Sequence, residues 1–218
     1  MTASKRIFDL VLATLGLLMI WPVLLLVALA IKCSDRGPVF FRQERVGEGG
    51  KRFCIWKFRT MRSAPQGHGN PLTVGQDPRV TAVGSWLRRS KLDELPQLFN
   101  VIRGEMSFVG PRPELPCFVD RYTAEQRRVL QFRPGVTSLA SIKFLDEDDL
   151  LGRVEDPERF FMEKIVPERA RTDLEYAARA TVLSDLMVMV KTVFRLGRRD
   201  AQPQDDAACR HQSTSARR

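Results

Sequence analysis

Residues 10–31 read LVLATLGLLMIWPVLLLVALAI, a run of 22 residues without a charged side chain. A straight helix of this length is long enough to span a bilayer. Pro22 stands near the middle of the run, where proline removes one helical hydrogen bond and clashes with the preceding turn. Two interpretations follow: a spanning helix that proline merely kinks, or a re-entrant helix that breaks at Pro22 and returns to the side it entered.

The charges that flank the apolar run favour the re-entrant interpretation. Lys5 and Arg6 precede the run, and Lys32 and Arg36 follow it. Basic flanks prefer the cytoplasmic side of a membrane, and a spanning helix satisfies that preference at one end only. The run is long for a signal peptide and no A-x-A cleavage site follows it, which argues against cleavage. We therefore expect a re-entrant membrane helix with Pro22 as the membrane break.

The composition limits what the rest of the chain can be. The 218 residues are 44% hydrophobic and 28% charged, which predicts one globular domain beside the membrane segment. The net charge of +9 indicates an anionic partner. Residues 1–62 hold eleven Lys and Arg against four acids, so the basic charge gathers beside the apolar run. This placement favours anionic lipid over nucleic acid, for which the chain has no recognised motif.

Histidine and cysteine usage excludes several kinds of site. Only two histidines are present, which argues against a His-rich metal centre. The four cysteines form no CxxC pair, which excludes zinc ribbons and thioredoxin-like motifs. Isolated cysteines of this kind are expected to be small buried hydrophobic residues in a reducing, cytoplasmic setting.

The remaining pattern predicts an α+β fold that is mainly helical. Residues 38–41 and 53–59 predict a small β-hairpin, and residues 63–80 a flexible loop. Two helices are expected at 85–90 and at 92–102, the second ended by Gly104. A third begins at Thr123, with Gln126 completing a capping box, and a fourth begins at Asp156-Pro157 and is interrupted at Pro167. The last helix runs to about Arg195 and is ended by Gly197.

The last helix carries Leu183, Met187, Val190 and Phe194 at helical spacing. Such a stripe is more often part of a core than a membrane contact, so we expect it to be buried. The predicted organisation is a membrane helix with its flanks (1–36), a helical catalytic domain at the membrane interface (37–196) and a disordered tail (197–218).

The densest cluster of candidate functional residues is SKLDELPQLFN, residues 90–100. Asp93 and Glu94 stand together at a helix start, where acids commonly cap free N–H groups. Arg88 lies upstream, and Arg112 is held between Pro111 and Pro113. Arginine forks match phosphate oxygens, so carboxylates with arginines and few histidines suit Mg²⁺-assisted phosphoryl transfer.

Several motifs in this order resemble the bacterial sugar transferase family, the small monotopic polyprenol-phosphate phosphoglycosyl transferases. The resemblance covers roughly residues 4–196. It rests on KR and FD at 5–9, GPVFF with Q-x-R-x-G at 37–47, KFRTM at 57–61, LDELPQLFNV at 92–101, GEMS at 104–107, VGPRP at 109–113 and RPGVT at 133–137.

The resemblance implies that Asp93 attacks the β-phosphate of a nucleoside diphosphate sugar, with a UDP-sugar as the expected donor, and forms a covalent phosphosugar intermediate. Polyprenol (undecaprenyl) phosphate then accepts the phosphosugar, which starts glycan or polysaccharide assembly. Glu94 matches the second catalytic residue. Arg88 and Arg112, with Lys57 and Arg59 of the KFRTM motif, are expected to bind phosphate. The resemblance also implies that Asp93 binds Mg²⁺. It implies that the protein lies on the cytoplasmic face of the bacterial inner membrane.

The chain departs from the family pattern in two places. Trp21 precedes the proline where serine is common, and residues 138–149 differ where sugar recognition is expected, so the sugar cannot be carried over. With no multi-helix module ahead of the apolar run, we expect a minimal catalytic unit. A homodimer is compatible with the sequence, although no feature requires one. The alternative interpretation is a membrane-anchored scaffold or binding protein whose carboxylates only cap a helix.

Overall fold

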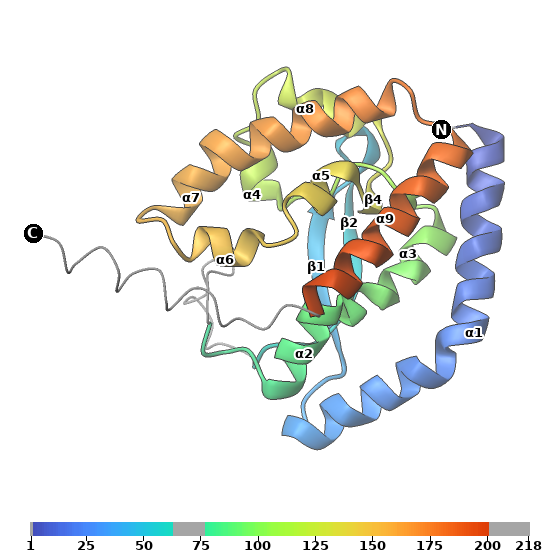
Figure 1. The fold of residues 1–218 in the computed structure, drawn as a ribbon, viewed down its shortest axis with the longest axis vertical. Coiled ribbons are helices and arrows are strands. Elements are labelled where there is room, and N and C mark those ends of the chain that lie inside the picture. The colour runs from blue at the N-terminus through green and yellow to red at the C-terminus, as the bar shows by residue number, and fades with distance from the viewer. Residues whose placement is uncertain (1, 63–76, 201–218) are drawn as a thin grey trace, which may run out of the picture.

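The computed structural model describes residues 2–62 and 77–200. Helix α1, Ala3–Asp35, runs along one side of the molecule and bends in its middle (Figure 1). Thr2 caps its beginning, and Arg36, in the left-handed conformation, ends it. The chain stays helical through Pro22, so the expected break is a bend within one helix.

One side of α1 packs against the domain along its length. Ala13 joins a cluster with Ile55, Leu98, Val101 and Met106. Val27 and Ile31, beyond the bend, join a second cluster with Phe58 and Leu87. The other side is exposed, with large apolar residues such as Leu18 and Leu26. The helix is long and apolar enough to cross a membrane.

The expected hairpin is confirmed. Strands β1, Phe40–Val46, and β2, Arg52–Phe58, pair antiparallel, with Phe40 opposite Phe58 and Val46 opposite Arg52. The short 3₁₀ turn η1, Glu48–Gly50, connects them. Gly49 and Gly50 have φ of 69° and 75°, a region that glycine adopts without a steric cost.

Helix α2, Ala82–Ser90, begins at the Thr81 cap. A tight turn at Lys91 connects it to the segment that carries Asp93 and Glu94. Gly84 lets α2 lie against the end of the hairpin, because a Cβ at this position would come within 2.0 Å of the Thr60 carbonyl oxygen. The expected helix at 92–102 is a 3₁₀ helix, η2 (Leu92–Gln97), followed by α3 (Leu98–Arg103). Gly104, with φ of 83°, ends α3 as expected.

The second half of the chain contains several short helices, two longer ones (α8 and α9) and two short parallel strands. Its elements are β3 (Ser107–Val109), α4 (Pro116–Val119), the 3₁₀ helix η3 (Gln126–Gln131), β4 (Gly135–Thr137), α5 (Leu139–Lys143), α6 (Glu147–Leu151), α7 (Pro157–Phe160), the π-helical segment η4 (Phe161–Ile165), α8 (Val166–Ala177) and α9 (Val182–Asp200).

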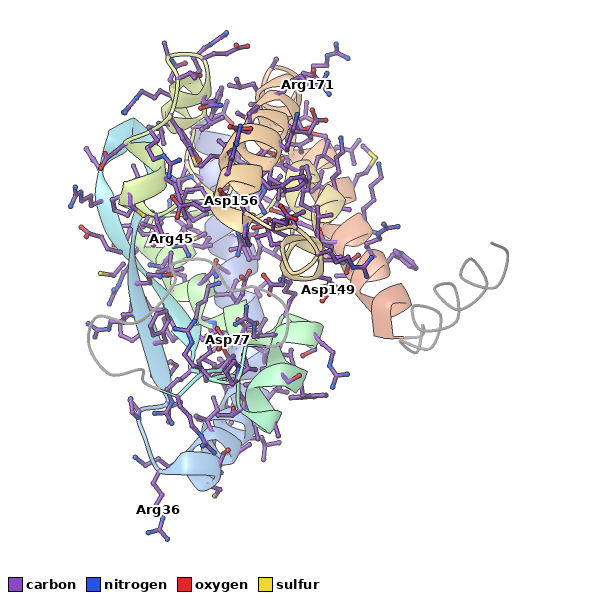
Figure 2. All side chains as sticks on the ribbon, turned by 90° about the vertical axis from the view of Figure 1, so that its left-hand side faces the viewer. Arg36, Arg45, Asp77, Asp149, Asp156 and Arg171 are labelled. Atoms are coloured by element: carbon purple, nitrogen blue, oxygen red, sulfur yellow. The ribbon has the colours of Figure 1, made fainter. Side chains whose placement is uncertain are left out.

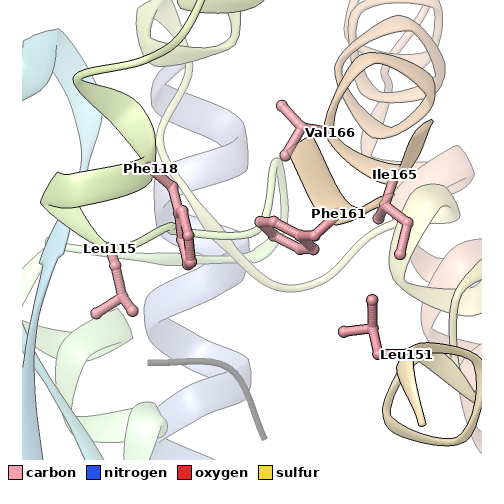
Figure 3. Close-up of a cluster of buried hydrophobic side chains, with 6 residues drawn as sticks. All are labelled: Leu115, Phe118, Leu151, Phe161, Ile165 and Val166. Atoms are coloured by element: carbon pink, nitrogen blue, oxygen red, sulfur yellow. The ribbon is translucent and has the colours of Figure 1, made fainter. Parts of the chain in front are cut away.

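Figure 3 shows the core cluster below α8. Four elements and the residue before α4 contribute to this cluster, which consists of Leu115, Phe118, Leu151, Phe161, Ile165 and Val166. The rings of Phe118 and Phe161 are 5.0 Å apart between centroids. This cluster joins α4 and α6 to the start of α8.

The capping interactions predicted at Thr123 and at Asp156 are both confirmed. Thr123 and Gln126 exchange backbone-to-side-chain hydrogen bonds, although the helix that follows is 3₁₀ and begins at Gln126. Asp156 caps α7 by accepting from the Arg159 N–H. Pro167 does not end this helix, because the π-helical segment η4 absorbs the change in hydrogen bonding just before it.

The predictions for the last helix are wrong in two respects. Helix α9 continues through Gly197 to Asp200, so the first residues of the expected tail are helical. The stripe of Leu183, Met187, Val190 and Phe194 is exposed rather than buried, with Phe194 71% exposed. The packed side of α9 instead carries Asp185 and Val188, which are 1% and 3% exposed.

Three further predictions concern the cysteines, the loop and the tail. Cys33, Cys54 and Cys117 are free and exposed, so the expectation of buried cysteines is wrong for them. The part of the loop at 63–76 and the tail residues 201–218 lie outside the described residues.

Candidate active site

The turn at Lys91 places the two carboxylates. Lys91 has φ of 56°, which ends α2 and starts η2 in a single residue. A 3₁₀ helix has three residues per turn, so adjacent side chains point about 120° apart. Asp93 and Glu94 therefore face different neighbours, although both are buried, at 7% and 8% exposure.

Glu94 is bound by two cations. Lys57 Nζ, from β2, donates to Glu94 Oε1 over 2.7 Å, and Arg112 Nη2 donates to the same oxygen over 3.2 Å. Burial alone would raise the pKa of Glu94, but Lys57 and Arg112 together hold it well below its usual range. Glu94 in turn is the main cause that raises the pKa of Arg112. Glu94 is therefore an ionised carboxylate that fixes two cationic side chains.

Asp93 has a different environment. Its Oδ1 is buried and has no hydrogen-bond partner among the described residues. Burial raises the pKa of Asp93; Lys57 opposes this effect, and the neighbouring Glu94 adds to it. A buried carboxylate oxygen without a partner is costly unless a ligand satisfies it. The two carboxylates thus differ: two cations bind Glu94, whereas Asp93 has a buried oxygen that is available to a ligand.

The segment that carries Arg112 is tied to the hairpin. The Val46 N–H donates to the Glu114 carbonyl oxygen over 3.0 Å, which forms an isolated bridge next to β1. Arg45 Nη1 donates to the Pro113 carbonyl oxygen over 3.2 Å and to Glu114 Oε2 over 3.4 Å. The rigid Pro-Arg-Pro turn is therefore held at its end, so that Arg112 reaches Glu94.

Arg88 approaches the site from α2. Its Nη2 donates to Asp148 Oδ2, in α6, over 2.8 Å. It is also one of the cations that lower the pKa of Asp93. Asp148 thus holds a guanidinium that lies close to the available carboxylate.

Comparisons with known proteins identify the family. A family model described as bacterial sugar transferase matches residues 1–199. The chain belongs to this family. Every motif that carries the resemblance in the sequence lies within the matched range.

Relatives within the family carry names that state their reactions. A UDP-glucose:undecaprenyl-phosphate glucose-1-phosphate transferase of Escherichia coli (strain K12) is 41% identical over 199 residues, covering 88% of this chain and 39% of the relative. An enzyme of the same name from Caulobacter vibrioides is 41% identical over 192 residues, covering 87% of this chain and 68% of the relative.

A third relative acts on another sugar. The UDP-N-acetylgalactosamine-undecaprenyl-phosphate N-acetylgalactosaminephosphotransferase of Aeromonas hydrophila is 34% identical over 197 residues, covering 87% of this chain and 42% of the relative. This chain spans about two fifths of the length of the E. coli and Aeromonas relatives.

Of the residues that the family motifs predict to bind phosphate, Arg59 lies beside Gly37 rather than on Glu94, which Lys57 and Arg112 contact. A Cβ at Gly37 would come within 1.7 Å of Arg59 Nη1, so this guanidinium lies against the chain that enters β1. Figure 2 shows Arg36 at the lower end of the molecule, below Arg45 and Asp149. Arg59 is therefore positioned near the end of α1, while Lys57 and Arg112 contact Glu94.

Sequence reasoning missed the contacts of three charged residues beside the candidate site, Arg45, Glu114 and Arg169. Arg45 was noted only as part of the Q-x-R-x-G motif. Arg169 Nη1 donates to Glu114 Oε1 over 2.9 Å, and both side chains are buried. One signal was available. Val166, Arg169, Ala170 and Asp173 have the spacing of one helix face, and two charged residues on an otherwise apolar face indicate buried partners.

The described residues offer few ligands for a metal ion. No group of three or more His, Cys, Asp or Glu side chains that could hold a metal occurs within residues 2–62 and 77–200. The available Asp93 Oδ1 is a hard oxygen ligand. Mg²⁺ commonly binds through one or two carboxylates together with substrate phosphates, so this arrangement fits Mg²⁺ better than a metal held by protein ligands alone.

Proposed function

We propose that this protein transfers a sugar phosphate from a UDP-sugar to undecaprenyl phosphate through a covalent intermediate on Asp93. The observation that carries the proposal is the division of labour between the carboxylates. Glu94 is neutralised by Lys57 and Arg112, while Asp93 keeps a buried oxygen without a partner. The names of the relatives supply the two substrates.

In the first step, a carboxylate oxygen of Asp93 attacks the β-phosphorus of the donor. A new P–O bond forms, the bond between that phosphorus and the bridging oxygen breaks, and UMP leaves with the electron pair. The product on the enzyme is an acyl phosphate that carries the sugar. Arg112 and Lys57, fixed by Glu94, are placed to stabilise the charge on the phosphoryl oxygens.

In the second step, an oxygen of undecaprenyl phosphate attacks the same phosphorus. The acyl phosphate bond breaks, and Asp93 returns to a free carboxylate. Arg88 is placed to bind phosphate oxygens once its guanidinium leaves Asp148. The product is an undecaprenyl diphosphosugar.

We propose that Asp93 would hold Mg²⁺, which fits a hard oxygen ligand of this kind. When bound, the ion would reduce the repulsion between an anionic nucleophile and an anionic phosphate. Its charge would also favour the ionised form of Asp93, whose pKa burial raises.

We propose that α1 is re-entrant and that both of its ends lie on the cytoplasmic face. The support comes from packing at both ends. Arg6 Nη1 and Nη2 donate to the Val101 and Ile102 carbonyl oxygens over 2.6 and 2.8 Å. Val27 and Ile31, near the other end, pack with Phe58 and Leu87. A straight spanning helix would carry its ends to opposite sides of the bilayer, where one domain could not contact both.

The exposed apolar face of α9 fits the same arrangement. An apolar patch of this kind marks a contact with lipid or with another protein. Lys5, at the beginning of α1, forms an ion pair with Asp185, so α9 is tied to the membrane helix. We therefore propose that α1 and α9 contact the membrane together.

The test is release of UMP from a panel of UDP-sugars, with undecaprenyl phosphate, with and without Mg²⁺. We expect Asp93→Asn to lower the rate by at least about 10³-fold, because the amide is a poor nucleophile toward phosphorus. The variant should remain in the membrane fraction. Asp120→Asn, which changes an exposed aspartate of the same type, is the matched control.

Without the acceptor, the wild-type protein should release one equivalent of UMP and gain the mass of the sugar phosphate. Normal turnover by Asp93→Asn would disprove the nucleophile. Absence of release with every donor would favour the scaffold interpretation.

A further inference from the structure

Arg169 lies between one buried carboxylate, Glu114, and one partly buried carboxylate, Glu147. On α8, it donates through Nη1 to Glu114 Oε1 over 2.9 Å and through Nη2 to Glu147 Oε2. Its guanidinium carbon is 5.7 Å from the ring centroids of both Phe144 and Phe161. The planar fork is therefore fixed by two ion pairs and by two aromatic rings.

The first carboxylate leads to Arg112. Glu114 follows the Pro-Arg-Pro turn directly, and Arg45 joins the Glu114 carboxylate to the Pro113 carbonyl oxygen. Arg112 is two residues from Glu114, so displacement of the Glu114 side chain moves the turn that aims Arg112 at Glu94.

The second carboxylate leads to Arg88. Glu147 is the first residue of α6, and the next residue, Asp148, accepts from Arg88 Nη2. Arg169 thus holds the beginning of α6, and α6 holds the arginine on α2. Through Glu114 and Glu147 one side chain reaches both arginines, although these are 24 positions apart in the sequence.

The burial of Arg169 and Glu114 distinguishes their ion pair from one on the surface and favours a positioning role for Arg169. Glu114 and Arg169 are 8% and 9% exposed. Burial raises the pKa of Glu147, and Arg169 opposes this effect. Without Arg169, Glu147 would lose its ion-pair partner and Glu114 would keep only Arg45, so repulsion between the two carboxylates would favour displacement or protonation of one of them.

We propose that Arg169 is a positioning residue that sets the two phosphate-binding arginines, Arg112 through Glu114 and Arg88 through Glu147. The statement that these arginines bind phosphate rests on the proposed function. The statement that Arg169 fixes their segments does not, and hydrogen exchange can test it without turnover.

The experiment compares amide hydrogen exchange in full-length protein in lipid nanodiscs, in peptides that cover residues 109–116 and 145–152. Arg169→Lys keeps the charge and is the principal variant, because lysine lacks the fork that reaches both carboxylates. We expect exchange to rise about threefold or more in both segments. Glu114→Gln should affect only residues 109–116, and Glu147→Gln only residues 145–152.

The matched control is Arg171→Met, on the same helix. Arg171 is exposed and pairs with Glu168, so its loss should leave exchange in both segments unchanged. Unchanged exchange in Arg169→Lys, or an equal rise in both segments for Glu114→Gln, would overturn the proposal. The second result would indicate general loosening of the domain.

Kinetics provide the second measurement. Arg169→Lys should lower kcat/KM for the UDP-sugar about tenfold, because Arg112 and Arg88 are proposed to act on phosphate oxygens during both binding and chemistry. Arg171→Met should leave kcat/KM unchanged, and a wild-type kcat/KM in Arg169→Lys would contradict positioning of these arginines. If the wild-type protein releases no UMP from any donor, the proposed function fails, whereas the exchange result still decides whether Arg169 holds both segments.

Discussion

Helix α8 buries Arg169 and Asp173, whereas the next helix in the chain, α9, exposes Leu183, Met187 and Phe194. Both depart from the usual placement of charged residues outside and apolar residues inside. The buried charges of α8 have partners within the domain, of which Glu114 is one. The apolar face of α9 is exposed and is covered by none of the residues that the structure describes.

The comparison shows what helical periodicity can and cannot reveal. A stripe of like residues establishes that a helix has two different faces. Which face is buried depends on what surrounds the helix, and a membrane reverses the preference that water imposes. The orientation of α9 follows from one buried acid, Asp185, and its neighbour Val188.

The largest effect on stability is expected at Asp185, the point where α9 is tied to α1. Its carboxylate accepts from Lys5 and from the Tyr176 hydroxyl. Loss of one partner from a buried ion pair costs about 3 kcal/mol of unfolding free energy. Asp185→Asn should therefore lower the thermal midpoint by several degrees in differential scanning calorimetry.

The control for this variant is Glu158→Gln. Glu158 pairs with Arg121, and both side chains are about half exposed. Exposed pairs contribute less than about 1 kcal/mol. Equal destabilisation by the two variants would mean that Asp185 does not anchor α9.

An intermediate effect is expected at Asp173, the second buried charge of α8. Burial raises the pKa of Asp173 to about 7. An unfolded aspartate titrates near 3.9, so between about pH 4 and pH 7 the folded state holds a proton that the unfolded state has lost. The free energy of unfolding therefore falls as the pH rises through this window, and the loss is complete above about pH 7.

Asp173→Asn should remove this dependence. Between about pH 5.5 and pH 8 the free energy of unfolding of the wild-type protein should fall by about 2 kcal/mol, whereas that of the variant should not change through this group. Urea unfolding at both pH values measures the difference. Parallel pH dependences in the two proteins would show that Asp173 ionises normally.

The smallest effect is expected on the exposed face of α9. Met187→Glu with Val190→Glu places two charges on the apolar face without touching the packed side. Partition into lipid vesicles should fall about tenfold, or about 1.4 kcal/mol, because charged groups are unfavourable in the acyl region. Ala178→Glu with Ala180→Glu, at exposed positions just after α8, adds the same charge elsewhere. Similar partition of both double variants would argue against lipid contact by α9.

Local signals predicted much of the fold. The hairpin, the Gly104 end of α3 and the Asp156 cap each depend on residues that are close in the sequence. The errors arose where distant segments decide. Helix α9 passes through Gly197, and η2 is 3₁₀ because Lys91 makes the turn from α2 in one residue.

The candidate site shows the same limit. The sequence identified Asp93, Glu94, Lys57 and Arg112, which the fold brings together. It could not indicate that Asp148 holds Arg88 from 60 positions away, or that Arg169 reaches Glu114 across 55. These contacts depend on how α6 and α8 pack, which no local pattern determines.

The ion pair between Lys5 and Asp185 joins residues 180 positions apart. Synthesis proceeds at about 5–20 residues per second, so the ribosome needs on the order of 10–40 s to reach Asp185 after making Lys5. During that time α1 has left the ribosome while its final partner does not yet exist. The beginning of α1 is therefore without its ion-pair partner until the last helix has been made, and the packing of α1 against α9 is among the last contacts that the chain can form.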